Sequence, residues 1–135
     1  MAAPVDRNQN TGRDGEEQAA HYLESQGCLI LARNWRSPYT RNEIDLIVRD
    51  GESIVFVEVK SARTESFGDP LQWVTPEKQD ALIRAATAYL EKAPDMPGGY
   101  RFDIITIAPP DEQGRRAITH VRNAFTADDV FDEDW

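Results

Sequence analysis

NEIDLIVRDGESIVFVEVK, residues 42–60, contains the two most strand-like segments of the chain, joined at Asp50-Gly51. Apolar, mostly β-branched residues recur through both segments, and Asp-Gly favours a tight hairpin turn. A plain core strand would be apolar throughout, but Glu43, Asp45, Glu58 and Lys60 stand at positions where such a strand would carry apolar residues. The segment therefore predicts a hairpin that holds functional side chains in addition to side chains of the core.

The alternation of side chains along a strand sorts these charges onto one face. If Asp50-Gly51 is the two-residue turn, Glu43 faces Glu58 across the hairpin, and Asp45 is a diagonal neighbour of Glu58. The charged face also carries Ile47, Ile54 and Phe56. The opposite face is wholly apolar: Ile44, Leu46, Val48, Val55, Val57 and Val59.

Two interpretations fit the charged face. Carboxylates as close as Asp45 and Glu58 repel and raise each other's pKa unless a cation lies between them, and Mg²⁺ typically takes one or two carboxylates plus water and phosphate. Lys60 points the same way and could act on a metal-bound water or on a phosphate. The alternative is a solvated outer sheet face, which the three apolar neighbours make less comfortable.

The remaining segments predict a single α/β domain. A helix is expected in TGRDGEEQAAHYLESQG, with Gly27 as its stop, and a second follows Thr75-Pro76. The expected order is α-β-β-β-α-β-β around a mixed sheet of about five strands flanked by helices. Expected strands outside the hairpin are CLILARNW, RFDIITIAP and RRAITHVRNAF. The domain spans residues 12–126, between a disordered lead-in (1–11) and an acidic tail (127–135).

Composition limits the classes of function. The net charge is −9, but the last eight residues hold five acidic and no basic side chains, which leaves 19 acidic against 15 basic residues. Charge alone therefore gives no support for nucleic-acid binding. The single cysteine, Cys28, excludes an intramolecular disulfide. No apolar run is long enough for a membrane span or a signal peptide, so the cytoplasm is the expected compartment.

A family resemblance rests on five segments in order: TGRDGEEQAAHYL, ILARNWR, NEIDLI, FVEVK and RFDIITI. Asp45 followed by Glu58-Val-Lys60 resembles the signature of the PD-(D/E)xK nuclease superfamily. The wider chain, about residues 11–125, resembles the bacterial YraN-like family, which is similar in fold to the archaeal Holliday-junction resolvases. The chain departs from the pattern at Asn42, where the family usually has Gly, and at Ile44, where the superfamily has proline.

The resemblance implies a restriction-endonuclease-like core and a metal-dependent endonuclease, a hydrolase of phosphodiester bonds. Asp45 and Glu58 would bind one or two Mg²⁺ or Mn²⁺ ions, and Lys60 would be the catalytic lysine. Glu16 would be a further catalytic acid, although a carboxylate in a first helical turn is also favourable by itself. Glu43 would lie in the outer shell of the site.

The expected partner is nucleic acid, with DNA, branched DNA in particular, favoured over RNA, and no membrane. The resemblance also implies a homodimer, whose interface no residue identifies. Five arginines are candidate phosphate contacts or plain surface charges: Arg13, Arg33, Arg36, Arg41 and Arg63. The alternative function is a nucleic-acid-binding or scaffold protein that keeps the nuclease fold with little or no activity.

Overall fold

Two helices and five strands follow one another in the predicted order. The computed structural model describes residues 7–62 and 74–127, with side chains from residue 14 onward. The elements are α1 (Arg7–Ser25), β1 (Leu29–Arg36), β2 (Glu43–Asp50), β3 (Ser53–Ser61), α2 (Pro76–Leu90), β4 (Tyr100–Ile107) and β5 (Ile118–Phe125). The α-β-β-β-α-β-β order and the α/β class are thus confirmed.

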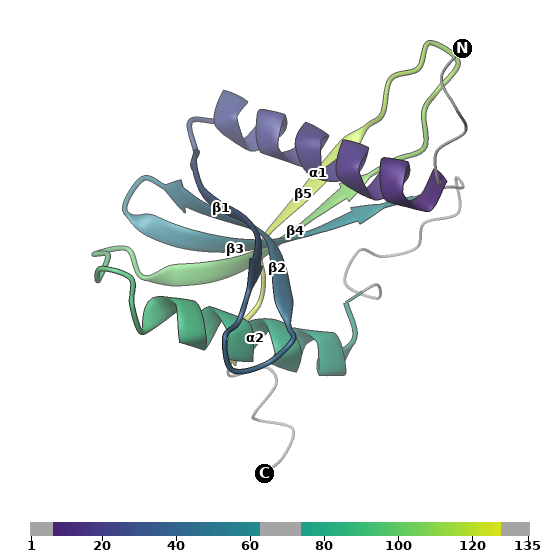
Figure 1. Ribbon diagram of the computed structural model, residues 1–135. Coiled ribbons are helices and arrows are strands. Elements are labelled where there is room, and N and C mark those ends of the chain that lie inside the picture. Colours follow the sequence, from purple (N-terminus) through teal and green to yellow (C-terminus); the bar gives the residue numbers. More distant parts are fainter. Residues whose placement is uncertain (1–6, 63–73, 128–135) are drawn as a thin grey trace.

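The strands form one mixed sheet in the order β1-β2-β3-β4-β5. Only β3 and β4 are parallel, and the other neighbouring pairs are antiparallel. A parallel pair needs a long crossover connection, and α2 lies in that connection. Figure 1 shows α1 and α2 on opposite faces of the sheet, so the fold has three layers. Within the described residues, neither helix is long and apolar enough to cross a bilayer.

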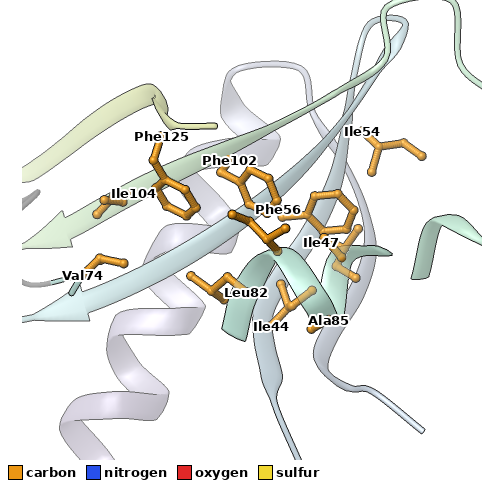
Figure 2. Packing of buried hydrophobic residues seen from close by; sticks show 12 residues of the cluster. Ile44, Ile47, Ile54, Phe56, Val74, Leu82, Ala85, Phe102, Ile104 and Phe125 are labelled. Carbon is orange, nitrogen blue, oxygen red and sulfur yellow. The ribbon is translucent and has the colours of Figure 1, made fainter. Parts of the chain in front are cut away.

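Each face of the sheet has its own apolar core. Under α1, Leu23 and Ala19 pack with Leu46, Val55 and Val57. Under α2, the core is built on aromatic and aliphatic side chains that Figure 2 shows from close by, among them Ile47, Ile54, Phe56, Leu82, Phe102 and Phe125. Alternation along β3 thus sends Val55 and Val57 to one core and Phe56 to the other, as predicted.

The helix ends follow from their capping residues. α1 begins at Arg7, so it includes residues 7–11, which the sequence assigned to the lead-in. It stops where predicted: Gly27 has a φ of 91°, and the Cys28 N–H donates to the Leu23 carbonyl at 3.0 Å. At the start of α2, the Thr75 hydroxyl accepts a hydrogen bond from the Lys78 N–H at 3.2 Å.

The predicted hairpin register is wrong by two residues. Asp50 pairs with Ser53 and Leu46 with Val57, so the loop consists of Gly51 and Glu52. Gly51 has a φ of 59°, and among the described non-glycine residues only Asn34 and Asn123 have positive φ. A positive φ at the first loop position alone is the pattern of a type II′ turn, not of the type I′ turn that Asp-Gly suggested. A shift of two leaves every side chain on its predicted face.

One face assignment is also wrong. Ile44 packs in the α2 core with Ile47, not in the α1 core with Leu46. Figure 2 shows Ile44 beside Leu82 and Ala85 of α2. The strict alternation of β2 is therefore broken between Ile44 and Leu46, beyond the last β2–β3 pair.

Candidate functional site

The site begins where the β2–β3 ladder ends. The last pair is Leu46 with Val57, and Asp45 and Glu58 are the next residues of the two strands beyond it. There the Val59 N–H donates to the Asp45 carboxylate at 2.8 Å. A side-chain oxygen thus takes the place of a backbone acceptor, which holds Asp45 at the opening between the two strands.

Glu58 is the most deeply buried acid of this site, with 4% of its surface exposed. Its Oε1 lies 3.4 Å from Lys60 Nζ and 3.8 Å from Lys78 Nζ. Its Oε2 is buried and has no hydrogen-bond partner among the described residues. Burial and the nearby charge of Asp45 raise the pKa of Glu58 to about 7, against the lysines, which lower it. This carboxyl group is poised between its protonated and ionised forms near neutral pH.

Asp45 is perturbed in the same direction. Burial raises the pKa of its carboxyl group, and the charge of Glu43 adds to this effect. The Val59 N–H, Lys78 and Lys60 oppose it without cancelling it. Two acids that both resist ionisation, side by side, form a site whose charge is incompletely compensated by the protein itself.

Glu16 reaches the same region from α1. Burial raises its pKa, the charges of Asp45 and Glu43 raise it further, and a hydrogen bond from Asn34 lowers it. The close approach of α1 depends on its neighbour Gly15, because a Cβ there would clash with Ser61 Oγ. Asp14 also binds Arg116 at 3.3 Å, which ties this part of α1 to the segment before β5.

The irregular residue Asn34 explains how groups from both layers meet here. It has a φ of 49°, the left-handed region, in the middle of β1. After it, Trp35 packs against the α2 core, whereas Arg33 before it binds Glu17 of α1 at 3.0 Å. The end of the sheet is thus kinked, and Glu16 of α1 and Lys78 of α2 can both act on the Asp45–Glu58 pair.

The predicted outer residues are distributed unevenly. Glu43 binds Arg36 at 3.2 Å, and its charge raises the pKa values of both Asp45 and Glu16. Arg33 is occupied by Glu17, and Arg41 is exposed in the turn between β1 and β2. The Arg13 side chain and the whole of Arg63 lie outside the described residues. Among the described residues, the structure therefore brings Arg36 against Glu43, and the charge of Arg33 acts on Glu16, whose pKa it lowers.

Lys78 is a site residue that sequence reasoning missed. It lies in the first turn of α2, and its ammonium group completes a pair of cations around Glu58. The available signal was its place three residues after the predicted cap Thr75, which orients the first turn of the helix. The sequence did not reveal that this turn returns to the β3 end of the sheet.

A second buried carboxylate, Asp103 on β4, was missed as well. It accepts hydrogen bonds from Arg101 Nε at 3.0 Å and from the Asn123 N–H at 2.9 Å, and it contacts His120 Nε2 at 2.7 Å. His120 Nδ1 in turn lies 3.0 Å from the Tyr22 hydroxyl. Burial alone would raise the pKa of Asp103, but these partners together hold it below its ordinary value.

The site can hold a cation but is not a complete metal centre by itself. Among residues 7–62 and 74–127, no three His, Cys, Asp or Glu side chains are grouped closely enough to enclose an ion. The donors that converge are two carboxylates, one with an unpartnered oxygen. That set suits a hard divalent ion that keeps waters and a substrate phosphate as its other ligands.

Comparisons with known proteins agree on one group. The sequence model of one family, described as "Uncharacterised protein family UPF0102", matches residues 15–107. A UPF0102 protein of Chlorobium phaeobacteroides is 45% identical over 118 residues, which cover 84% of this chain and 92% of the relative. A UPF0102 protein of Desulfosudis oleivorans is 39% identical, and the match covers 91% of this chain and 95% of the relative. A UPF0102 protein of Acidothermus cellulolyticus is also 39% identical, and the match covers 93% of this chain and 100% of the relative.

Proposed function

The chain belongs to the UPF0102 (YraN) family, and from that premise we propose that it is a divalent-metal-dependent phosphodiesterase that cleaves nucleic acid. The observation that carries the proposal is the state of Glu58: a buried acid beside a second acid and two lysines, with one oxygen that has no partner in the described part of the chain. A buried polar atom left without a partner is costly, so it signals a missing ligand.

The donor set fits Mg²⁺ or Mn²⁺. Asp45 and Glu58 would hold the ion, and Glu16 would accept a hydrogen bond from one of its waters. When bound, such an ion lowers the pKa of a coordinated water and neutralises phosphate charge. The chain's own residues set the geometry: the Val59 N–H fixes the Asp45 carboxylate, and Lys60 restrains Glu58.

The two lysines take separate roles in this proposal. Lys60 Nζ is 3.4 Å from the presumptive ligand Glu58 and is about a third exposed, so it can reach both the site and an incoming phosphate. It would position the attacking water or stabilise the charge that develops on the phosphate. Lys78 is further from Glu58, at 3.8 Å, and its helix N-terminus adds a positive field for phosphate.

The substrate class follows by the same chemistry. A site of carboxylates and lysines suits phosphodiesters, and DNA, branched DNA in particular, is our proposed substrate. A homodimer would place two such sites on one branched molecule. Because the chain carries a net charge of −9, binding should be weak and strongly dependent on salt concentration.

Cleavage assays test this function. Labelled linear, flapped and four-way DNA are incubated with the protein and Mg²⁺ or Mn²⁺, alongside Asp45→Asn and Lys60→Ala. We expect metal-dependent cleavage by the parent and at least a hundredfold loss in each variant, in the range for removal of one electrostatic or acid–base group. The control Arg122→Ala changes an exposed β5 residue and should cleave as the parent does. Activity that persists in Asp45→Asn would contradict the proposal.

A further inference from the structure

A groove lies between α2 and the β1–β2 turn, beside the carboxylate site. We call it the aromatic groove and define it by Trp35, Arg36, Tyr39, Tyr89 and Lys92. Its cavity volume is about 440 Å³, within the roughly 300–1,000 Å³ of sites that bind small organic groups. None of the five residues belongs to the carboxylate site, although Arg36 contacts it through Glu43.

Two walls of the groove are rigid aromatic rings. Trp35 and Tyr89 meet edge to face, with ring centroids 5.4 Å apart and an angle of 88°. Tyr89 is held from behind by Phe56 of the core, at 5.8 Å. Tyr39 stands at the mouth with 67% of its surface exposed, on the turn that the buried Ser37 anchors by accepting a hydrogen bond from the Tyr39 N–H. Exposed rings beside fixed ones form a stacking surface for a flat ring.

Positive charge lines the same groove in an otherwise acidic chain. The Arg36 guanidinium is two-thirds exposed although it binds Glu43 at 3.2 Å. Lys92 is exposed, and within the part of the chain that the structure describes its ammonium group has no ion-pair partner. Aromatic rings with cations beside them complement a ligand that is flat and apolar at one end and anionic at the other.

One ion pair links the groove to the carboxylate site. Arg36 binds Glu43, and Glu43 stands two strand residues, about 6.6 Å, from Asp45. A nucleic-acid strand advances by about 3.4 Å per nucleotide along a B-form axis. A strand whose phosphate lies at Asp45 would therefore bring a base one to a few nucleotides away to the groove. This short separation, with the positive charge of Arg36 and Lys92, favours a nucleotide over an unrelated peptide as the occupant.

We propose that the aromatic groove binds an unpaired base of a nucleic-acid strand whose scissile phosphate lies at the Asp45–Glu58 pair. The inference deepens the proposed function and rests on it. A base that is paired and stacked in a duplex cannot enter the groove without being extruded, which costs free energy. The substrate class is therefore nucleic acid with unpaired nucleotides next to the cleaved bond, such as a flap or an open branch.

The test uses Trp35 as its reporter and needs no metal. The full chain with Trp73→Phe and Trp135→Phe retains Trp35 as its only tryptophan. In EDTA, we titrate it with a thymidine oligonucleotide of about eight nucleotides and with a matched abasic oligomer that has the same phosphates but no bases. We expect quenching of Trp35 by the thymidine oligomer and at least tenfold weaker binding of the abasic one. Equal affinities would overturn the proposal.

Three further variants of the protein with Trp35 as its only tryptophan separate the contribution of the bases to binding from that of the phosphates. Tyr39→Ala should weaken binding of the thymidine oligomer about tenfold and leave the abasic oligomer unchanged. Lys92→Ala should weaken both oligomers alike and reduce the salt dependence. Tyr100→Ala removes another exposed aromatic side chain, one that does not line the groove, and it should change the affinity for neither oligomer. Tyr39→Ala without effect would overturn the proposal, as would an acidic, aromatic peptide that quenches Trp35 more strongly than the thymidine oligomer.

The outcomes distinguish the groove from the nuclease. If the parent cleaves flaps and Tyr39→Ala cleaves them with unchanged kcat/KM, the groove inference fails and the proposed function stands. If the thymidine oligomer quenches Trp35 with base dependence but no substrate is cleaved with any metal, the groove is supported as a binding site and the nuclease proposal fails.

Discussion

Asp103 and Glu58 are both buried carboxylates of the same sheet, but the protein treats them in opposite ways. Asp103 is 1% exposed and has an arginine, a histidine and a backbone N–H as partners, and its pKa is lowered. Glu58, 4% exposed, has one oxygen without a hydrogen-bond partner within residues 7–62 and 74–127, and its pKa is raised to about 7. Their residues lie on adjacent strands, since Glu58 pairs with Ile104, the residue after Asp103.

The difference separates a carboxylate that serves the fold from one that is available for chemistry. Asp103 links three elements through Arg101, His120 and, by way of His120, Tyr22 of α1. Nothing in its surroundings is left for a ligand. The Glu58 site, in contrast, has two buried acids with raised pKa values and lies where the strand ladder ends, and one Glu58 oxygen has no partner among the described residues. Burial of a carboxylate is therefore no sign of function until its partners are counted.

The largest expected effect is on stability, when each acid is replaced by its amide. Asp103→Asn removes a charge that compensates Arg101 and His120, and it should lower the free energy of unfolding by about 3 kcal/mol. Glu58→Gln relieves repulsion with Asp45 and should leave stability unchanged or higher. Urea unfolding at neutral pH without metal measures both. If Glu58→Gln is as destabilising as Asp103→Asn, then Glu58 is a structural carboxylate and the comparison breaks.

A smaller effect is expected from metal, and it sharpens the comparison. An ion that binds the folded state stabilises it by about 2.7 kcal/mol at a hundred times its Kd. Mn²⁺ should therefore raise the Tm of the parent and of Asp103→Asn by similar increments. Asp45→Asn and Glu58→Gln remove ligands and should respond much less, whereas Lys60→Ala should keep most of the response. Thermal melts over a Mn²⁺ series test this, and an equal shift in all variants would indicate non-specific binding.

The smallest expected effect is on how stability depends on pH. Glu58 should change stability near neutral pH, and Asp103 should change it at acid pH. The raised pKa of Glu58 means that its ionisation opposes folding, so stability is lost as pH rises from about 4.5 through about 7. The lowered pKa of Asp103 means that stability is present above 3.8 and lost as pH falls below it. The urea concentration at the unfolding midpoint is measured from about pH 3 to about pH 8. In Glu58→Gln this midpoint should no longer fall as pH rises toward neutral, and in Asp103→Asn it should no longer fall as pH drops below about 3.8. If the midpoint of Glu58→Gln still falls toward neutral pH as steeply as that of the parent, Glu58 is not the group that causes this pH dependence.

Much of the fold could be predicted because its signals are local. Thr75-Pro76, Gly27 and the apolar alternation of β3 each act within a few residues, and each was confirmed. The predicted register was wrong because Gly51 suits either the second loop position of a type I′ turn or the first loop position of a type II′ turn, and the sequence does not decide between them. The predicted face of Ile44 was wrong because the alternation of β2 breaks there. The break lies near Asn34, the residue with positive φ in the neighbouring strand β1.

The candidate site could be predicted in part for the same reason. Asp45, Glu58 and Lys60 share one hairpin, so two-residue alternation was enough to place them together. Lys78 and Asp103 depend on tertiary structure. Lys78 reaches Glu58 only because the first turn of α2 lies beside that part of β3. Asp103 meets His120 and Tyr22 only after β5 and α1 have packed on β4.

The parallel pairing of β3 with β4 has a consequence for the order of folding. The hairpin of β2 and β3 is local and can form early, but the other edge of β3 stays unpaired until α2 has crossed the sheet and β4 has arrived. Contacts that close so long a loop form late and slowly. On the ribosome, Asp45 and Glu58 therefore emerge well before the strand that buries Glu58 on its other side. The burial that perturbs Glu58 is therefore complete only after β4 has paired with β3, well after the hairpin that carries the acid has formed.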